Sequence, residues 1–297
     1  MSHERKTHLD LQAVLLLVLC TALWGITQVA AKVALSEIPP LSQGAARSAG
    51  AALLLMLWAR GRGIALFERD GTFGAGWLAG ALFALEFGCI FVGLQYTSAS
   101  RMVVFIYLSP FVVALGMPFI AHSERLRPLQ WLGLLAGFSG VALAFVEGFT
   151  GPTVGSRQWV GDTLGVTAAL LWGATTLVVR GSKLAGAAAE KTLFYQLAVS
   201  ALLMAVGAAL AGETPTLRLS AQAWWLLGFQ AVVVSFASFL TWFWLVRHYA
   251  ATRLSAFTLL TPLFGLLAGA AILGEPVTAR LLVALATVCA GIVLVNR

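Results

Sequence analysis

The sequence has 297 residues, of which 60% are hydrophobic and only 10% are charged, and its mean hydropathy is +0.90. Soluble proteins carry a charge on about a quarter of their residues, so this composition excludes a soluble globular protein and indicates a membrane protein. The net charge is +7, but the basic residues recur in short segments between apolar runs. That pattern is typical of orientation signals in membrane proteins, and no nucleic-acid partner is expected.

Apolar runs long enough to cross about 30 Å of hydrocarbon as helices follow one another along the chain. In the first half they lie near residues 11–35, 42–60, 74–94, 98–120 and 129–147. In the second half they lie near residues 160–180, 190–211, 222–245, 253–273 and 277–295. The first run is too long for a signal peptide and lacks a clear cleavage site, so it is predicted to be an uncleaved helix. The sequence therefore predicts an all-α integral membrane protein with ten transmembrane helices.

The distribution of basic residues predicts the orientation. If the amino terminus is cytoplasmic, thirteen of the 19 Lys and Arg residues lie on the cytoplasmic side or at the adjoining helix ends. The excess of basic residues in short cytoplasmic loops is the usual determinant of membrane topology. Both termini are therefore expected in the cytoplasm, which agrees with an even number of spans.

An internal repeat divides the chain into two halves, residues 1–150 and 156–297. A Trp-Gly pair in the first span of each half recurs at an offset near 150, and so do a Pro in the fourth span, a following Glu and a Gly in the fifth: Trp24 and Trp172, Pro110 and Pro262, Glu124 and Glu275, Gly140 and Gly291. Because each half contains an odd number of spans, the halves enter the membrane in opposite senses. This is the inverted-repeat architecture that many secondary transporters use for alternating access.

On these residues the sequence resembles the drug/metabolite transporter superfamily, and in particular EamA-type proteins with two five-helix repeats. Within that superfamily it is most similar to bacterial inner-membrane exporters of amino acids, including aromatic amino acids. The resemblance implies a multi-pass protein of the bacterial inner membrane that exports small metabolites from the cytoplasm through a central cavity.

Glu86 is the one carboxylate predicted to lie within the membrane, between Leu85 and Phe87. An unpaired charge near the bilayer centre costs several kcal/mol, so an intramembrane carboxylate is a candidate functional residue. It would contact a substrate ammonium group or bind a proton. The alternative is a neutral structural residue that is hydrogen-bonded to a neighbouring helix.

Two tryptophans are predicted at mid-depth, although Trp usually favours the membrane interfaces. Trp24 and Gln28 are four residues apart and share a helical face, and Trp172 and Thr176 repeat that spacing in the second half. Buried indole N–H groups need hydrogen-bond acceptors. These side chains either line the substrate pathway or pack between helices.

A polar stripe is predicted on the eighth span, formed by Gln230, Ser235, Ser238 and Trp242. The last three follow the i, i+3, i+7 spacing of one helical face. The stripe either lines the pathway or makes hydrogen bonds between helices.

Pro110 and Pro262 are predicted to kink the fourth and ninth spans, and Tyr107 and Thr258 precede them by three and four residues. A proline leaves the carbonyl group four residues earlier without its helical donor. Freed backbone at mid-depth is tolerated where it is buried in protein or lines a wet cavity. Both alternatives, a packing kink and a cavity-lining hinge, stay open.

Glu124 and Glu275 precede the fifth span of each half and are interpreted as structural, because a carboxylate can meet the free N–H groups at a helix start. Glycines four residues apart, such as Gly133 and Gly137, have the spacing that permits close helix approach.

The spans contain no nucleophile with a base, no carboxylate pair and no metal-ligating cluster, so an intramembrane enzyme is the remote alternative, and no cofactor or metal is expected. A cavity with aromatic rings and one carboxylate suits neutral or aromatic amino acids, with protons as a second partner. It would also suit cationic drugs through cation–π attraction. Multiply anionic substrates are not expected, because no basic residue is placed securely at mid-depth; Lys32 and Arg47 point either inward or outward.

Overall fold

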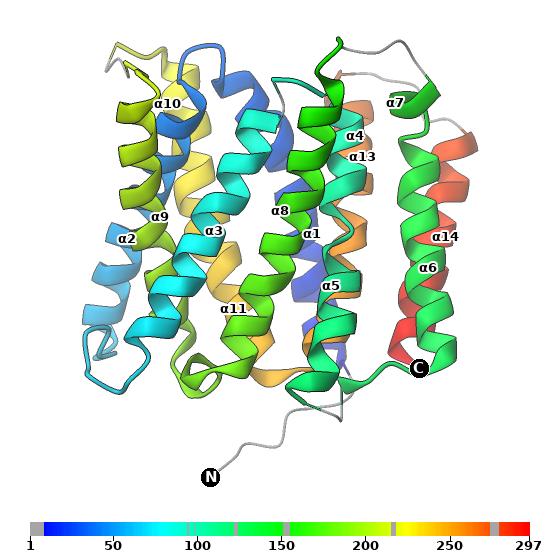
Figure 1. Cartoon of the computed structure of the whole chain (residues 1–297), viewed down its shortest axis with the longest axis horizontal. Helices are drawn as coiled ribbons and strands as arrows, with labels where there is room; N and C mark the ends of the chain where they lie inside the picture. The colour runs from blue at the N-terminus through cyan, green and yellow to red at the C-terminus, as the bar shows by residue number, and fades with distance from the viewer. Residues whose placement is uncertain are drawn as a thin grey trace.

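The computed structural model describes residues 9–93, 95–97, 99–121, 124–150, 155–214, 218–273 and 279–297. Its long helices run side by side through a single bundle, and both termini lie at the same end of it (Figure 1). The helices of the first half are α1 (Leu11–Ala34), α2 (Pro40–Gly61), α3 (Phe73–Gly93), α4 (Ala99–Ile106), α5 (Ser109–Gly116), α6 (Pro128–Ala144) and the short α7 (Glu147–Thr150). Those of the second half are α8 (Gln158–Gly181), α9 (Ala189–Leu210), α10 (Ala221–Gly228), α11 (Phe239–His248), α12 (Ala251–Phe257), α13 (Thr261–Leu273) and α14 (Ala279–Asn296).

Within the described residues, five helical stretches are both long and apolar enough to cross a membrane: Phe73–Gly93, Arg101–Phe119, Gln158–Gly181, Ala189–Leu210 and Ala221–His248. Three shorter apolar stretches accompany them: Leu11–Thr27, Pro128–Ala144 and Leu282–Asn296. The predicted helical fold is therefore confirmed, and the count of ten crossings stays a prediction.

Three helical stretches of the bundle are irregular in the middle. α4 ends at Ile106 and α5 begins at Ser109, directly before Pro110. A 3₁₀ turn at Thr258–Leu260 separates α12 from α13, which begins with Thr261 and Pro262. Between α10 and α11 the backbone forms a π-helix at Phe229–Ser238. Irregular backbone within a membrane protein often marks a functional position, because such backbone needs protein or water around it.

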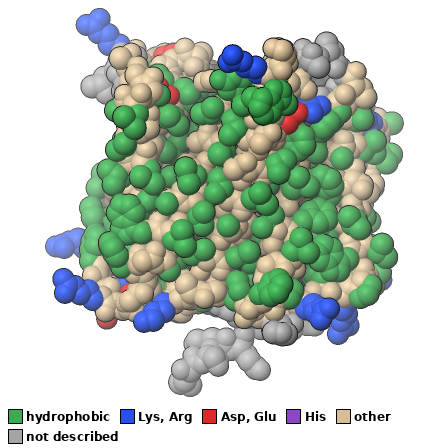
Figure 2. Space-filling view, viewed as in Figure 1, with side chains coloured by type: hydrophobic (Ala, Val, Ile, Leu, Met, Phe, Trp, Pro, Cys, Tyr) green, Lys and Arg blue, Asp and Glu red, His purple; other side chains and the backbone are tan. Residues whose placement is uncertain are grey.

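The outer surface is apolar in the middle and charged at both ends, as a lipid bilayer requires. Figure 2 shows hydrophobic side chains over the middle of the molecule, with Lys, Arg and acidic side chains gathered at its two ends. Leu53, Leu85 and Leu132 are among the large apolar side chains that are exposed on the outside. An apolar outer surface around the middle of the molecule is stable only in contact with lipid.

Glycines set the closest helix contacts. On α6 and α14, a Cβ atom at Gly291 would lie 2.5 Å from the carbonyl oxygen of Gly133, so any side chain there would push the two helices apart. On α3, Gly76 and Gly80 face Tyr195 and Val199 of α9 in the same way. Small residues at these positions allow the helices to pack in the absence of a hydrophobic driving force between them.

The repeated Trp-Gly pair has a symmetrical structural role. A side chain at Gly25 on α1 would collide with the carbonyl oxygen of Thr261, at 2.6 Å, at the interruption between α12 and α13. A side chain at Gly173 on α8 would collide with Val112 of α5, at 2.5 Å, next to the interruption between α4 and α5. Each glycine thus lets the first long helix of one half pack against the interrupted helix of the other half.

Candidate functional site

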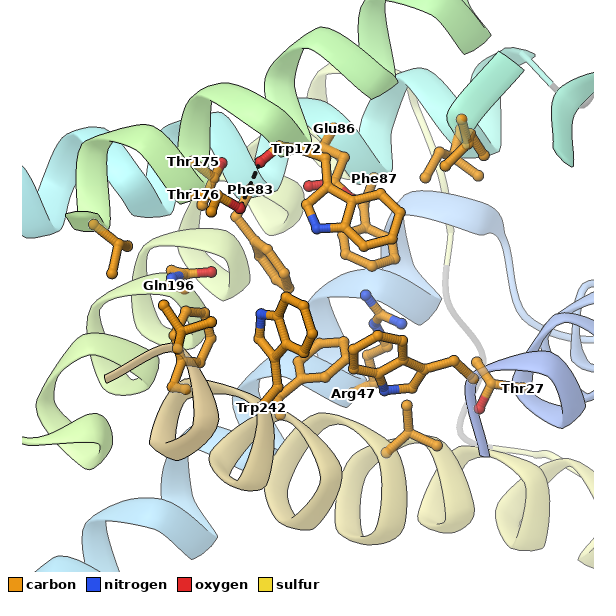
Figure 3. A pocket seen from close by; sticks show the side chains of 18 of the residues that line it. Thr27, Arg47, Phe83, Glu86, Phe87, Trp172, Thr175, Thr176, Gln196 and Trp242 are labelled. Carbon is orange, nitrogen blue, oxygen red and sulfur yellow. Dashed lines mark hydrogen bonds between the residues drawn. The ribbon is translucent and has the colours of Figure 1, made fainter. Parts of the chain in front are cut away.

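A cavity lies inside the bundle, with walls from both halves of the chain. The space open to the centres of water molecules is about 100 Å³, which is enough for several waters. Six residues predicted from the sequence line it: Trp24, Glu86, Tyr107, Trp172, Thr176 and Trp242. Further lining residues that sequence reasoning missed include Thr27, Phe83, Phe87, Thr175 and Gln196, and also Phe239 (Figure 3).

Trp24 connects the two halves at the cavity wall. Its Nε1–H donates a hydrogen bond to Oγ of Ser238, 2.8 Å away, and the Ser238 hydroxyl in turn donates to the carbonyl oxygen of Val234. The indole ring meets Trp242 edge-on with ring centroids 5.4 Å apart, and Phe239 at 5.8 Å. The buried indole N–H thus has the acceptor that a tryptophan at this depth needs.

Trp172 occupies the corresponding place in the second half. Its ring meets that of Tyr107 edge-on, with centroids 5.8 Å apart, directly at the interruption between α4 and α5. One turn further along α8, the Thr176 hydroxyl donates to the carbonyl oxygen of Trp172 (Figure 3). The two tryptophans therefore contribute aromatic walls from opposite halves of the chain.

Glu86 lies on α3 and faces the cavity, with only 5% of its surface exposed. Within the described part of the chain, no hydrogen bond or ion pair to its carboxylate is formed. Phe83 and Phe87 of the same helix also line the cavity, and their rings meet edge-on with centroids 4.9 Å apart. A carboxylate in this setting has no fixed donor among the described residues, so a charged or hydrogen-bonding occupant of the cavity would stabilise it.

Arg47 is the most consequential residue that sequence reasoning left undecided. It lies on α2, is 2% exposed and reaches the cavity instead of the outer surface. Its guanidinium carbon sits 3.9 Å from the centroid of the Phe87 ring, and Nε and Nη2 have no hydrogen-bond partner among the described residues. Of the two directions that the sequence left open for Arg47, the side chain therefore takes the inward one, and a basic residue does line the cavity.

Gln196 on α9 is the counterpart of Arg47 in the second half. Arg47 is the eighth residue of α2 and Gln196 the eighth residue of α9, at a chain offset of 149. Gln196 is 1% exposed, and neither its amide nitrogen nor its amide oxygen has a partner among the described residues. Polar groups thus enter the cavity at equivalent positions of both halves, but the charged ones, Arg47 and Glu86, both come from the first.

Four residues predicted to line the pathway lie away from the cavity. Gln230 is fully buried and accepts a hydrogen bond from Nε2 of Gln43, 3.1 Å away. Ser238 lies behind Trp24, and the Thr258 hydroxyl donates to the carbonyl oxygen of Ser255.

The fourth, Ser235, is buried but does not reach the cavity. The prediction of one stripe with Ser235, Ser238 and Trp242 assumed α-helical spacing. In the π-helix the bonds join residues five apart, so that spacing fails. Gln28 falls in α1, but its side chain lies outside the described residues, and Glu275 lies outside them altogether.

Glu124 meets a helix start, as interpreted from the sequence, but the helix is α12 and not α6. Its carboxylate accepts from the backbone N–H of Ala251, 2.7 Å away, and forms an ion pair with Arg180. Arg180 also donates to the carbonyl oxygen of Val246. These contacts tie the first half to α8, α11 and α12 at the end of the bundle that holds both termini.

Comparisons with known proteins agree with this architecture. The model of the EamA-like transporter family matches residues 11–146 and again residues 159–297. The uncharacterized transporter YoaV of Bacillus subtilis is 25% identical over 277 residues, which cover 92% of both chains. An uncharacterized transporter of Synechocystis is 27% identical and covers 100% of this chain and 93% of its own.

A crystal structure of a protein with 18% sequence identity superposes with a TM-score of 0.81 over 95% of this chain and 96% of its own. That likeness concerns the fold alone. The two family matches, one in each half, together cover nearly the whole sequence. The chain belongs to the EamA-like transporter family.

Proposed function

We propose that this transporter exports neutral amino acids, above all those with large apolar or aromatic side chains, from the bacterial cytoplasm by alternating access. The observation that carries the proposal is the cavity between the two halves, which is lined by aromatic rings and by Glu86. An apolar side chain would pack against Trp24, Trp172 and Trp242, and the ammonium group would meet the carboxylate.

The membrane arrangement in this proposal is ten spans in two inverted halves, residues 1–150 and 156–297, in the inner membrane with both termini cytoplasmic. The location of both chain ends at one end of the bundle supports an even number of crossings (Figure 1). The broken fourth and ninth spans, at Pro110 and Pro262, are the positions at which the halves would move, because their missing helical hydrogen bonds lower the cost of bending.

Efflux of cationic drugs is the second candidate, favoured by the same carboxylate and by the aromatic faces, which attract cations. Proton exchange at Glu86 is compatible with either substrate class. Arg47 weighs against a purely cationic substrate, because a second positive charge would enter a cavity that already contains one.

The test is counterflow of labelled compounds into proteoliposomes, with phenylalanine, leucine, serine and a cationic dye. We expect phenylalanine and leucine to accumulate against an unlabelled internal pool, and serine and the dye to accumulate much less. Uptake of the dye alone would replace export of amino acids by drug efflux. Liposomes without protein serve as the control for leakage.

A further inference from the structure

The cavity contains one buried charge of each sign, on neighbouring helices and at similar depth. Arg47 is seven residues after the first residue of α2, and Glu86 is seven residues before the last residue of α3. α2 begins and α3 ends at the same end of the bundle (Figure 1). At a rise of about 1.5 Å per residue, both charges therefore lie roughly 10 Å in from that end.

Neither charge has a charged hydrogen-bond partner of its own. The guanidinium group of Arg47 lies on the Phe87 ring with two nitrogens unbonded, and Glu86 accepts no hydrogen bond from the described residues. Figure 3 shows both side chains among the aromatic rings of the cavity. Two opposite charges held in one cavity with largely apolar walls offer a donor fork and an acceptor to the same occupant.

Net charge then selects the occupant. A simple cation would neutralise Glu86 but leave Arg47 without an anion, and a simple anion would do the reverse. Each case leaves an uncompensated charge in a low-dielectric interior, which is costly. A zwitterion satisfies both charges and adds none.

From this geometry we infer that the cavity is a zwitterion site: Arg47 binds the α-carboxylate of the substrate, Glu86 binds its α-ammonium group, and the aromatic rings bind its side chain. The assignment of the carboxylate to Arg47 rests on the proposed transport function and narrows it. Amines without a carboxylate and acids without an ammonium group are poor substrates. Gln196, the neutral counterpart of Arg47, contributes no charge to this selection.

The experiment compares phenylalanine with 2-phenylethylamine, which lacks the carboxylate, and with 3-phenylpropionate, which lacks the ammonium group. Each compound competes with labelled phenylalanine in counterflow. Each also quenches tryptophan fluorescence of the purified protein, because Trp24, Trp172 and Trp242 line the cavity. We expect phenylalanine to bind at least about tenfold more tightly than either analogue, since one charged hydrogen-bonding contact is lost in each.

The variants assign the roles. Arg47→Gln should abolish the preference for phenylalanine over phenylethylamine, and Glu86→Gln should abolish its preference over phenylpropionate. Arg47→Lys keeps the charge and should keep the preference with weaker binding, because the fork geometry is lost. Arg62→Gln, at an exposed arginine beyond the end of α2, is the matched control and should change nothing.

Two results separate this inference from the transport function. If phenylalanine is transported but Arg47→Gln leaves its advantage over phenylethylamine intact, the zwitterion site is wrong and amino-acid export stands. If the analogues show the expected order in fluorescence but phenylalanine is not transported, the site stands and the export proposal falls. Tighter binding of phenylethylamine than of phenylalanine to the wild type overturns the inference directly.

Discussion

The indole N–H of Trp24 on α1 donates a hydrogen bond to the hydroxyl of Ser238, 2.8 Å away at the end of the π-helix. The bond joins α1 in the first half to the π-helix in the second half, at the wall of the cavity. The position of this aromatic wall therefore depends on one buried donor and one buried acceptor.

Two substitutions of Trp24 distinguish the contribution of its aromatic ring from that of its N–H donor. Trp24→Phe keeps an aromatic wall but loses the hydrogen bond, which is worth about 1 kcal/mol in a helical membrane protein. We expect a small decrease in melting temperature and partial counterflow. Trp24→Ala should remove most transport at normal membrane abundance, because it also leaves a void beside Trp242.

Trp225 is the control for these variants, since 79% of its surface is exposed on the outside of the bundle. Trp225→Ala should leave counterflow intact. If Trp24→Ala also transported normally and only unfolded at a lower temperature, the tryptophan would be a packing residue and not part of the pathway.

Glu86→Gln keeps the shape and removes the charge. We expect weaker binding of phenylalanine, by about tenfold or more, at every pH from 6 to 8, because the ammonium group loses its counter-charge. Counterflow against pH is the measurement, and Glu68→Gln, at an exposed loop residue, is the control. Retained counterflow without any pH dependence would instead assign Glu86 to proton exchange, and an unchanged profile would contradict both roles.

Topology can be tested with reporter fusions. Fusions after Arg69 and after Arg127 should report the cytoplasm, and a fusion near Arg157 should report the periplasm. The α2–α3 connection and the start of α6 lie at the end of the bundle that holds both termini, whereas α8 begins at the other end (Figure 1). The same signal from all three positions would refute the inverted repeat.

The helices could be predicted from sequence because each is an apolar run bounded by Pro, Gly or charged residues. The start of α2 at Pro40 and the interruption between α4 and α5 next to Pro110 both follow from the missing N–H of proline. Two of the aromatic cavity residues can also be predicted from the sequence, because Trp24 and Trp172 lie in the middle of apolar runs and recur in both halves.

The direction of the charged Arg47 side chain could not be predicted in the same way. Arg47 is a single basic residue about two turns into its helix, and the sequence does not tell which way a lone side chain points in an all-round apolar helix. Its counterpart at Gln196 gives a signal only when the eighth residues of α2 and α9 are aligned, which requires exact helix starts. The helical face on which Ser235 lies could not be predicted for a different reason: the π-helix changes the residue periodicity that the α-helical spacing assumes.

We expect Asp70, in the loop between α2 and α3, to make a pH-dependent contribution to the stability of the fold. Lys191 donates to its carboxylate at 2.8 Å and Thr72 donates at 2.6 Å, and these hydrogen bonds hold the pKa of Asp70 below its usual range. A carboxyl group with a depressed pKa in the folded state stabilises the fold above its unfolded pKa, near about 3.9, and the contribution is lost as the pH falls. Asp70→Asn should therefore melt at a lower temperature than the wild type at pH 7.

The difference between Asp70→Asn and the wild type should begin to shrink as the pH falls below about 4, because the Asp70 carboxylate of the unfolded wild-type chain then becomes protonated while that of the folded chain stays charged, and it should shrink further as the pH approaches the depressed pKa of the folded state. Melting temperatures of the purified proteins in detergent give the measurement. Glu68→Gln is again the control, because Lys191 bonds to the backbone oxygen of Glu68 and not to its side chain. An equal difference at pH 7 and pH 3.5 would show that Asp70 acts through packing.

The ion pair of Glu124 and Arg180 should be the most costly polar contact to break, because both side chains are nearly inaccessible, at 7% and 1% exposure. Loss of one partner leaves the other charge buried, which typically costs about 3–5 kcal/mol. Loss of both removes that penalty. We therefore expect Glu124→Gln and Arg180→Gln each to destabilise strongly, and the double variant to be far less unstable than the sum of the two.

A double-mutant cycle on melting temperature or denaturant unfolding measures this coupling. The ion pair of Arg101 and Asp162 is the matched control. It joins α4 to α8 at the opposite end of the bundle, with both side chains more exposed, at 16% and 18%. Partly hydrated charges are screened and are worth less, so its coupling should be clearly smaller. Additive effects for Glu124 and Arg180 would mean that the two residues stabilise the protein separately, Glu124 through the amide of Ala251 at the start of α12 and Arg180 through the carbonyl of Val246 near the end of α11.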